Sequence, residues 1–118
     1  MSTETTRIIS FNVNGLRARL HQLQAVVDQH SPDIIGLQET KVSDEEFPVE
    51  AIEAMGYTVD FHGQKGHYGV ALLSKIEAVN VTRGYPTDND ESQRRMIHGE
   101  YLCNGKTIHV INGYFPQG

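Results

Sequence analysis

The feature that most constrains this sequence is a short apolar run that ends abruptly in polar and charged residues. It lies within the segment Asp33-Ile-Ile-Gly-Leu-Gln-Glu-Thr-Lys41 and follows the turn signal Ser31-Pro32. An apolar run this short and rich in β-branched residues is typical of a strand that is buried on both faces. We therefore expect this strand to lie inside a sheet, with the rest of the chain arranged around it.

The polar residues that follow this strand are candidates for a functional site. Gln38, Glu39, Thr40 and Lys41 lie where the strand leaves the core. Open α/β sheets bind their ligands just outside the carboxyl ends of strands, so Glu39 is well placed to hold a metal ion. In the alternative interpretation, Glu39 lies in solvent and pairs with Lys41.

Composition excludes several classes of protein. The chain has 118 residues, enough for one domain or part of one, with a net charge of −5 and a pI of about 5.6. This charge argues against a broad nucleic-acid-coating surface, although not against a small basic cleft assisted by a divalent cation. The single cysteine, Cys103, excludes an internal disulfide and a Cys/His zinc site. With no membrane-length apolar run and a polar amino end, we expect a cytoplasmic protein with no membrane partner.

The order of predicted elements is strand, helix, strand, helix and then mostly strands. Apolar residues from Leu16 to Val27 are spaced by three or four, as on one helix face, and Asn104-Gly105 between two strand-like runs signals a hairpin. We predict an α/β (α+β) fold with a mixed sheet and helices on one face. The predicted strands cover residues 7–13, 34–37, 57–61, 70–74, 78–82, 95–102 and 106–113, and the helices cover 16–30 and 48–56.

A second candidate ligand, Asn12, ends the first predicted strand just as Glu39 ends the central one. Two parallel strands joined by a helix would bring these side chains together. A carboxylate and a carboxamide suit Mg²⁺, which keeps most of its waters and takes only one or two protein carboxylates. The alternative for Asn12 is turn chemistry, because Asn-Val-Asn-Gly is a turn-prone tetrapeptide.

Three further features could bind an anion. The glycine-rich loop from Gly63 to Gly69 surrounds Lys65 and would let backbone N–H groups approach a phosphate, although it could equally be a plain hairpin. Arg95 could grip a phosphate, or it could be a solvated charge near an acidic loop. Tyr114 could hydrogen-bond a phosphate oxygen, or it could pack at the rim of the sheet.

Taken together, four segments resemble the exonuclease III and abasic-site endonuclease family of the exonuclease–endonuclease–phosphatase superfamily. The resemblance covers the chain from about Arg7 to Gly118. Its segments are Ser10-Phe-Asn-Val-Asn-Gly-Leu-Arg-Ala-Arg19, Asp33-Ile-Ile-Gly-Leu-Gln-Glu-Thr-Lys41, Gly63-Gln-Lys-Gly-His-Tyr-Gly-Val-Ala-Leu-Leu-Ser74 and Ile111-Asn-Gly-Tyr-Phe-Pro-Gln-Gly118.

This resemblance implies a reaction and a set of roles. Glu39 would bind a catalytic Mg²⁺ or Mn²⁺, with Asn12 supporting that site and Lys41 orienting Glu39. Tyr114 would contact the scissile phosphate. The reaction would be metal-assisted hydrolysis of a phosphodiester, 5′ to abasic sites or from 3′ ends of double-stranded DNA. The residues that would contact the DNA backbone are Arg17 with Ala18, Lys65, His67, Tyr68, Arg95 and Gln117.

One departure from the family pattern is large. The family fold is a four-layered α/β sandwich of roughly twice this length, and residues 1–118 resemble only the amino-terminal part of that single domain. The sequence has no Gly-Asp-x-Asn motif and no Ser-Asp-His motif, which would supply the water-activating aspartate and a histidine. We therefore expect the chain alone to be inactive or nearly so, to lack a carboxyl-terminal half as its partner, and to expose an apolar sheet face.

Two other interpretations stay open. The chain could be a non-catalytic truncated module that binds DNA or a partner through the retained half. It could also belong to another branch of the superfamily, such as a phosphoinositide phosphatase or a sphingomyelinase-like phosphodiesterase. The segment Asn14-Gly-Leu-Arg17 argues against the second of these.

Overall fold

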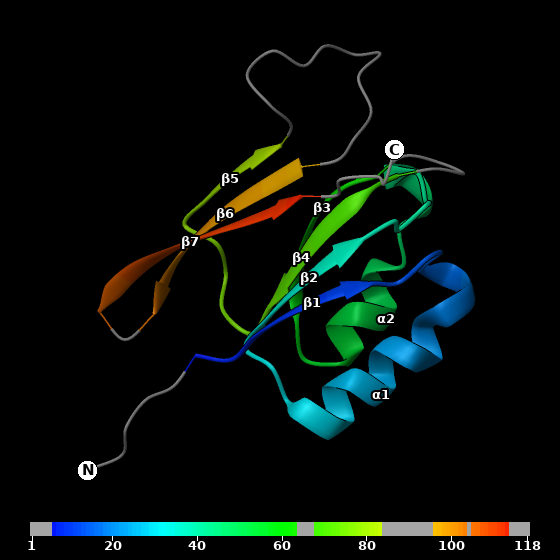
Figure 1. Cartoon of the computed structure of the whole chain (residues 1–118), viewed down its shortest axis with the longest axis horizontal. Helices are drawn as coiled ribbons and strands as arrows, with labels where there is room; N and C mark the ends of the chain where they lie inside the picture. The colour runs from blue at the N-terminus through cyan, green and yellow to red at the C-terminus, as the bar shows by residue number, and fades with distance from the viewer. Residues whose placement is uncertain (1–5, 64–67, 84–95, 104, 114–118) are drawn as a thin grey trace.

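Two β-sheets pack face to face, and two helices cover the outer face of the first sheet (Figure 1). The computed structural model describes residues 6–63, 68–83, 96–103 and 105–113. The elements are β1 (Ile8–Asn12), η1 (Arg17–Arg19), α1 (Leu20–His30), β2 (Ile34–Gln38), η2 (Asp44–Glu46), α2 (Val49–Ala54), β3 (Thr58–His62), β4 (Val70–Ser74), β5 (Asn80–Arg83), β6 (Met96–Cys103) and β7 (Lys106–Gly113).

The first sheet is mixed and has the strand order β1-β2-β4-β3. Strands β1 and β2 are parallel neighbours joined by η1 and α1, whereas β4 runs antiparallel to both β2 and β3. Every residue of the two central strands, β2 and β4, is buried. The prediction of a strand buried on both faces is therefore confirmed for β2.

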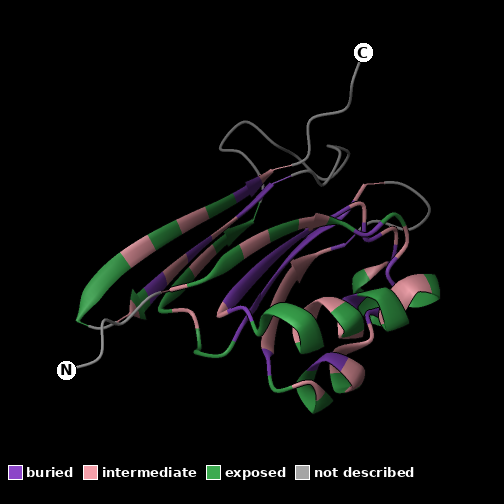
Figure 2. Cartoon of the chain, turned by 60° about the horizontal axis from the view of Figure 1, so that its bottom comes forward, coloured by how far each residue is buried: buried purple, intermediate pink, exposed green. Residues whose placement is uncertain are grey.

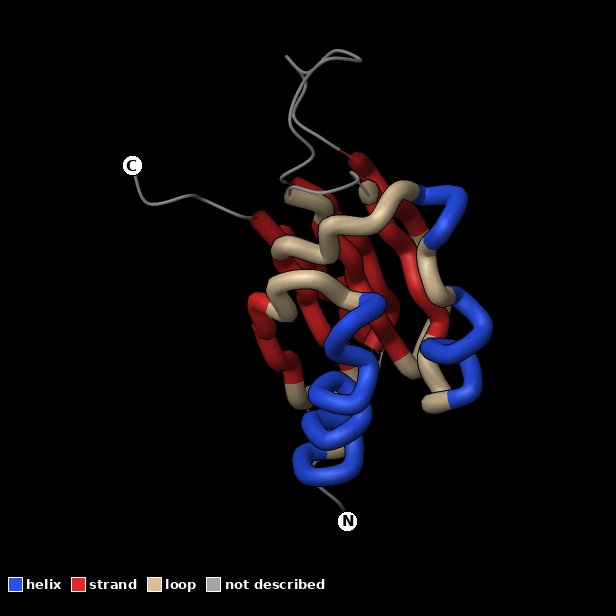
Figure 3. Tube along the Cα trace, turned by 90° about the vertical axis from the view of Figure 1, so that its right-hand side faces the viewer, coloured by secondary structure: helices blue, strands red, loops and turns tan. Residues whose placement is uncertain are grey.

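The second sheet contains β5, β6 and β7 in that order, all antiparallel. The predicted hairpin is confirmed by the pairing of Cys103 with Lys106, and Gly105 adopts a φ of +79°, which glycine tolerates without steric cost. Viewed from the side, the helices lie against one face of the first sheet and the second sheet against the other (Figure 3).

Alternation along β2 directs its side chains into two separate cores. Ile35 and Leu37 point toward the helices and join a cluster that includes Leu23 and Ile52, whereas Ile34 faces the second sheet. The second cluster consists of Ile34, Val70, Leu72, Ile97 and Tyr101. Figure 2 shows the buried residues concentrated in the strands between the helices and the second sheet.

The mixed sheet and α+β class are confirmed, but two sequence-based expectations were wrong. The last three strands form a second sheet rather than extending the first, because strand patterns do not reveal which sheet a strand joins. That second sheet covers the face of β2 and β4 that we expected to be exposed. Among the described residues, the exposed large apolar side chains are Ile8, Ile76, Val79, Leu102 and Ile111.

The helix expected over residues 16–30 is also divided in two. A 3-10 turn, η1, precedes α1, because Arg19 adopts a non-helical backbone conformation with φ −126° and ψ 26°. Within the part of the chain that the structure describes, no helix is both long and apolar enough to cross a membrane.

A buried tyrosine lies at the centre of the interface between the sheets. The ring of Tyr101 is fully buried and lies over Gly99, where an added Cβ would come within 2.7 Å of the ring. Among the described residues its hydroxyl has no hydrogen-bond partner. Burial raises the pKa of Tyr101 to about 12, and the nearby charges of Asp60 and Cys103 act in the same direction.

We expect Tyr101→Phe to stabilise the chain by about 1 kcal/mol at pH 8, because it removes a buried hydroxyl that makes no hydrogen bond. The folded pKa lies above the unfolded value of about 10, so the ionisation of Tyr101 costs no additional stability below pH 10. As the pH rises from 10 to 12, the unfolded chain ionises first and the wild type loses stability on the order of 1 kcal/mol more than Tyr101→Phe. Urea denaturation at pH 8 and pH 11 measures both effects.

The matched control is Tyr57→Phe, because the Tyr57 hydroxyl is also buried but donates a hydrogen bond to the carbonyl oxygen of Pro32. This variant should lose about 1 kcal/mol at pH 8. A loss of similar size in Tyr101→Phe at pH 8 would contradict the assignment of an unbonded hydroxyl.

Candidate functional site

The segments that follow β1 and β2 stay paired beyond the ends of the two strands. Three backbone N–H groups after β1 donate to carbonyl oxygens at the end of β2 and after it, with the pairing shifted by one residue after Val13. These bonds are Val13 N–H to Gln38 O at 3.0 Å, Gly15 N–H to Glu39 O at 2.8 Å and Leu16 N–H to Thr40 O at 2.9 Å. The loops carrying Asn12 and Glu39 are thereby held side by side.

This pairing brings the two predicted ligands into direct contact. The Nδ2 of Asn12 donates to Oε2 of Glu39 at 2.5 Å, and the Oδ1 of Asn12 accepts the backbone N–H of Asn14 at 3.1 Å. The Asn14 N–H can only donate and the carboxylate can only accept, so the two contacts agree on the orientation of the carboxamide. In this geometry Asn12 orients Glu39, and its own oxygen is already engaged.

Lys41 completes a small charged cluster around Glu39. Its Nζ donates to Oδ1 of Asn14 at 2.6 Å and lies 3.9 Å from Oε1 of Glu39. Lys41 therefore lies beside Glu39, a contact that both the metal-site interpretation and the alternative of an ion pair in solvent predict. The turn-prone tetrapeptide Asn-Val-Asn-Gly contains Asn14, but this pattern does not predict that Asn14 joins the cluster.

The backbone of the site is unusual. Four non-glycine residues around it adopt left-handed conformations, with φ values of 48° at Asn14, 55° at Glu39, 56° at Lys41 and 57° at Tyr68. Such conformations cost free energy for residues with a Cβ, and they persist where surrounding contacts over-determine them. One such contact is the Lys41 N–H donating to the Tyr68 carbonyl at 2.9 Å.

The residues present suit a hard divalent cation. Glu39 offers one carboxylate whose side chain is 22% exposed, so it is accessible from solvent while being held by Asn12. In the ranges that the structure covers, no group of three or more His, Cys, Asp or Glu side chains gathers around a point. One carboxylate with open positions fits Mg²⁺ or Mn²⁺ better than zinc, which normally needs three or four protein ligands.

Only some of the other predicted site residues lie in the part of the chain that the structure describes. Arg17 lies in η1 and forms an ion pair with Glu46 of η2, with 2.7 Å between Nη1 and Oε2. Tyr68 contacts the site through its backbone carbonyl. Five predicted residues lie outside the described residues, namely Lys65, His67, Arg95, Tyr114 and Gln117.

Sequence reasoning missed a buried polar link between the sheets. Gln38, directly before Glu39, contacts Asn112 of β7 through their side-chain carboxamides at 2.6 Å. The sequence pattern indicates Gln38 only as part of the polar end of the strand. The signal for Asn112 was weak, because an asparagine before glycine near the end of a strand normally indicates a turn.

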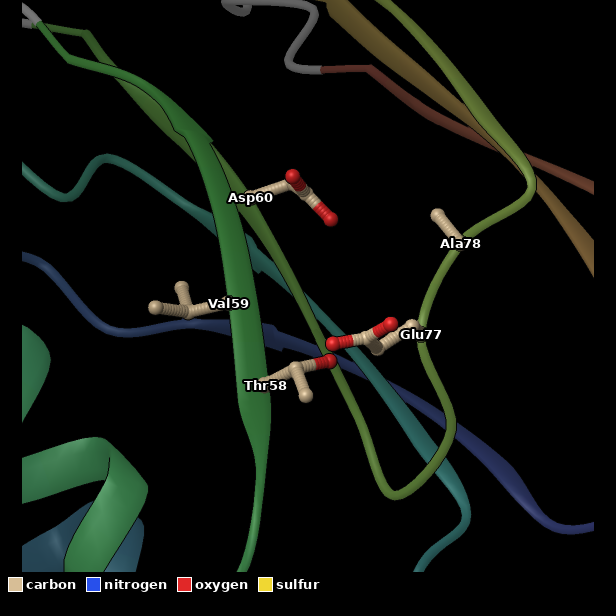
Figure 4. A pocket seen from close by; sticks show the side chains of 5 residues that line it. All are labelled: Thr58, Val59, Asp60, Glu77 and Ala78. Carbon is tan, nitrogen blue, oxygen red and sulfur yellow. The ribbon is translucent and has the colours of Figure 1, made fainter.

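A polar recess lies elsewhere, between β3 and the connection from β4 to β5 (Figure 4). Asp60 and Glu77 line it, and Thr58 points toward Glu77 in Figure 4. Asp60 is already paired with Arg83, with 3.6 Å between Oδ1 and Nη2. Because β3 and β1 form opposite edges of the first sheet, this recess is separate from the Glu39 cluster.

Fold and site together define an α+β protein of two packed sheets with a carboxylate–carboxamide pair at the ends of parallel strands. A profile of the Endonuclease/Exonuclease/phosphatase family matches residues 9–111. The chain belongs to that family.

Two relatives within this family that resemble the chain are exodeoxyribonucleases. The chain is 57% identical over 112 residues to exodeoxyribonuclease III of Haemophilus influenzae, a match that covers 95% of this chain and 42% of that protein. It is 30% identical over 113 residues to an exodeoxyribonuclease of Bacillus subtilis, covering 94% of this chain and 43% of that protein. The chain therefore spans about two-fifths of the length of these relatives.

Two solved structures share the fold of this chain. An AP endonuclease from Archaeoglobus fulgidus superposes with a TM-score of 0.84 at 38% identity, covering 97% of this chain and 42% of that one. A 3′ phosphatase from Neisseria bound to a product DNA hairpin gives a TM-score of 0.83 at 37% identity, covering 93% and 41%. The two-sheet arrangement is thus shared with proteins of this superfamily.

We expect Asn14→Ala to be less stable than Asn14→Gly by on the order of 1 kcal/mol. Both variants lose the hydrogen bond to Lys41, but only alanine has a Cβ that is strained at a φ of 48°. Urea denaturation of the two variants measures the difference. Equal stabilities would show that this backbone position is not held in the left-handed region in solution.

Proposed function

We propose that this chain carries the metal-binding edge of a DNA repair nuclease of the exodeoxyribonuclease III type. The observation that carries the proposal is the hydrogen bond from Asn12 to Glu39 across the ends of two parallel strands. It places a pre-oriented carboxylate where sheets of this kind bind ligands. The proposed reaction is hydrolysis of a phosphodiester 5′ to an abasic site, or at the 3′ end of duplex DNA.

The names of the relatives support DNA as the substrate. Exodeoxyribonuclease III, an AP endonuclease and a 3′ phosphatase bound to a DNA hairpin all resemble this chain at 37% identity or more. Abasic-site specificity goes beyond these likenesses and belongs to the proposal. The cytoplasmic setting likewise stays a prediction.

In this proposal, Glu39 holds Mg²⁺ or Mn²⁺, and Asn12 and Lys41 fix its orientation. The bound ion would neutralise the charge that develops on the phosphate. Lys41 limits the rotation of the carboxylate, because its ammonium lies 3.9 Å from Oε1. We place Tyr114 at the scissile phosphate, and Arg17, Lys65, His67, Tyr68, Arg95 and Gln117 along the DNA backbone.

We further propose that the 118-residue chain alone has little or no activity. Its sequence contains no Gly-Asp-x-Asn motif and no Ser-Asp-His motif, so it has no counterpart of the group that activates water in the family. Catalytic groups that act as a unit lose most of their effect when one is removed. A chain that binds duplex DNA but gives no cleavage even when the missing segment is supplied would favour the non-catalytic module.

The direct test uses a chimaera in which this chain replaces the matching segment of the H. influenzae exodeoxyribonuclease III. We expect the chimaera to cut a duplex with one abasic site, and the isolated chain not to. Glu39→Gln in the chimaera should lower kcat by at least about 1000-fold, since a catalytic metal supplies several kcal/mol. It should also weaken Mn²⁺ binding, measured by electron paramagnetic resonance of the free ion.

Glu53→Gln is the matched control, because it makes the same chemical change on the exposed surface of α2. It should leave kcat and Mn²⁺ affinity within twofold of the unchanged chimaera. Cleavage by the isolated chain that Glu39→Gln abolishes would refute the proposed dependence on further groups. Full activity of the Glu39→Gln chimaera would refute the metal role of Glu39.

The pairing of Arg17 with Glu46 leads to a prediction for DNA affinity. If Arg17 contacts a phosphate, Arg17→Ala in the chimaera should weaken duplex binding and reduce the slope of log K against log salt by about 1. Glu46→Gln should strengthen duplex binding by up to about fivefold at low salt, because it removes a competing partner of Arg17. Fluorescence anisotropy with labelled duplex at several salt concentrations measures both, and an unchanged slope in Arg17→Ala excludes the phosphate contact.

A further inference from the structure

A pair of buried carboxamides joins the two sheets next to the candidate site. Asn112 of β7 is 5% exposed and Gln38 of β2 is 9% exposed. The Nδ2 of Asn112 donates to the carbonyl oxygens of Leu37 at 2.8 Å and Ala71 at 2.9 Å, and its Oδ1 accepts from Nε2 of Gln38 at 2.6 Å. Both polar atoms of the Asn112 side chain are thus bonded to the first sheet.

The first sheet is shaped to receive this side chain. A Cβ added at Gly36 would come within 3.1 Å of Cγ of Asn112, so the glycine leaves the space that the carboxamide fills. The Nε2 of Gln38 also lies 3.0 Å from Oγ of Ser10 on β1 and 3.2 Å from the carbonyl oxygen of Gly36. The network therefore touches strands β1, β2 and β4 of the first sheet and β7 of the second.

Its position in the chain connects it to the site. Gln38 directly precedes Glu39, and its carbonyl oxygen accepts the N–H of Val13, the residue after Asn12. On the other side, Asn112 precedes Tyr114 by two residues in the sequence. Glu39 itself has a φ of 55°, a conformation that needs firm support from its neighbours.

We propose that Gln38 and Asn112 are positioning residues that set the orientation of Glu39 and tie it to the strand leading to Tyr114. The inference rests on the proposed metal role of Glu39. Because Gln38 is bonded through its side chain to β7 and through its backbone to β1, the start of the Glu39 loop cannot shift without breaking one of these contacts. Small displacements matter, since a misplacement of about 1 Å in an active site can cost on the order of 100-fold in rate.

The chemistry of the pair also indicates that Gln38 and Asn112 fix the relative orientation of the two strands and do not merely hold the sheets together. Replacing both partners of a buried hydrogen bond by apolar groups of similar shape can be nearly neutral for stability. Leucine or valine at these positions would hold the sheets together by packing, as Val110 does two residues earlier on the same face of β7. A directional carboxamide pair adds a fixed relative orientation of the two strands, which apolar packing does not provide.

The test compares Asn112→Ala and Gln38→Ala with the control Val110→Ala, which removes an apolar contact from the same strand and the same interface. In the isolated chain, the side-chain amide signal of Asn12 in a ¹⁵N NMR spectrum reports its bond to Glu39 without any metal. In the chimaera, Mn²⁺ affinity, kcat and KM are measured well below the melting temperature, which is determined for every variant.

If the pair positions Glu39, Asn112→Ala and Gln38→Ala shift the Asn12 amide signal, weaken Mn²⁺ binding by about tenfold and lower kcat by 10- to 100-fold, with KM for DNA within twofold. The double variant loses no more than the worse single one. Val110→Ala leaves the signal, the affinity and kcat unchanged even where it lowers the melting temperature as much.

The inference is overturned if the two carboxamide variants lower the melting temperature but keep the Asn12 signal, Mn²⁺ affinity and kcat within twofold of Val110→Ala. Failure of the proposed function is distinguishable from this. If the proposed function fails, Glu39→Gln leaves Mn²⁺ binding and activity unchanged, and the effect of the pair on metal binding is refuted as well. The Asn12 signal still decides whether the pair positions Glu39.

Discussion

The structure depends on the parallel pairing of β1 with β2 and on its continuation into the loops that follow. Parallel strands bring their carboxyl ends to the same edge, their register places Asn12 beside Gln38, and three backbone hydrogen bonds beyond the strands hold the following loops side by side. Asn12 and Glu39 are 27 residues apart in the sequence, yet this register leaves their side chains in contact. The charged cluster around Glu39 is therefore a consequence of sheet pairing, reinforced by local turn chemistry.

Burial of β2 on both faces makes this arrangement rigid. Ile35 and Leu37 are fixed by the helices, and Ile34 is fixed by the second sheet. A strand that is packed on both faces can carry a strained residue at its end. The packing opposes the backbone movement that would let Glu39 leave its left-handed conformation. The second sheet thus supports the site, although no hydrogen bond or ion pair joins its described residues to Glu39.

Much of this could be predicted from the sequence, because periodicity and turn signals are local. The apolar run before Gln38 predicted the central strand, and Asn104-Gly105 predicted the hairpin. The partition into two sheets could not be predicted, since it depends on which faces meet in space. For the same reason the contact of Gln38 with Asn112, 74 residues away, left no local trace, whereas Asn12 and Glu39 could be paired because each ends a strand.

The outward position of Ile111 and the inward position of Asn112 reverse the usual preference of their side chains. Ile111 is 69% exposed while Asn112 is buried. Side chains alternate along a strand, so sliding β7 by one residue would bury the isoleucine and expel the asparagine. The same slip would expose Val110 and bury His109, so apolar packing also favours the observed alignment. The hairpin turn and the three hydrogen bonds of the carboxamide oppose the slip as well, so Asn112 also acts as a register lock for the β6–β7 ribbon.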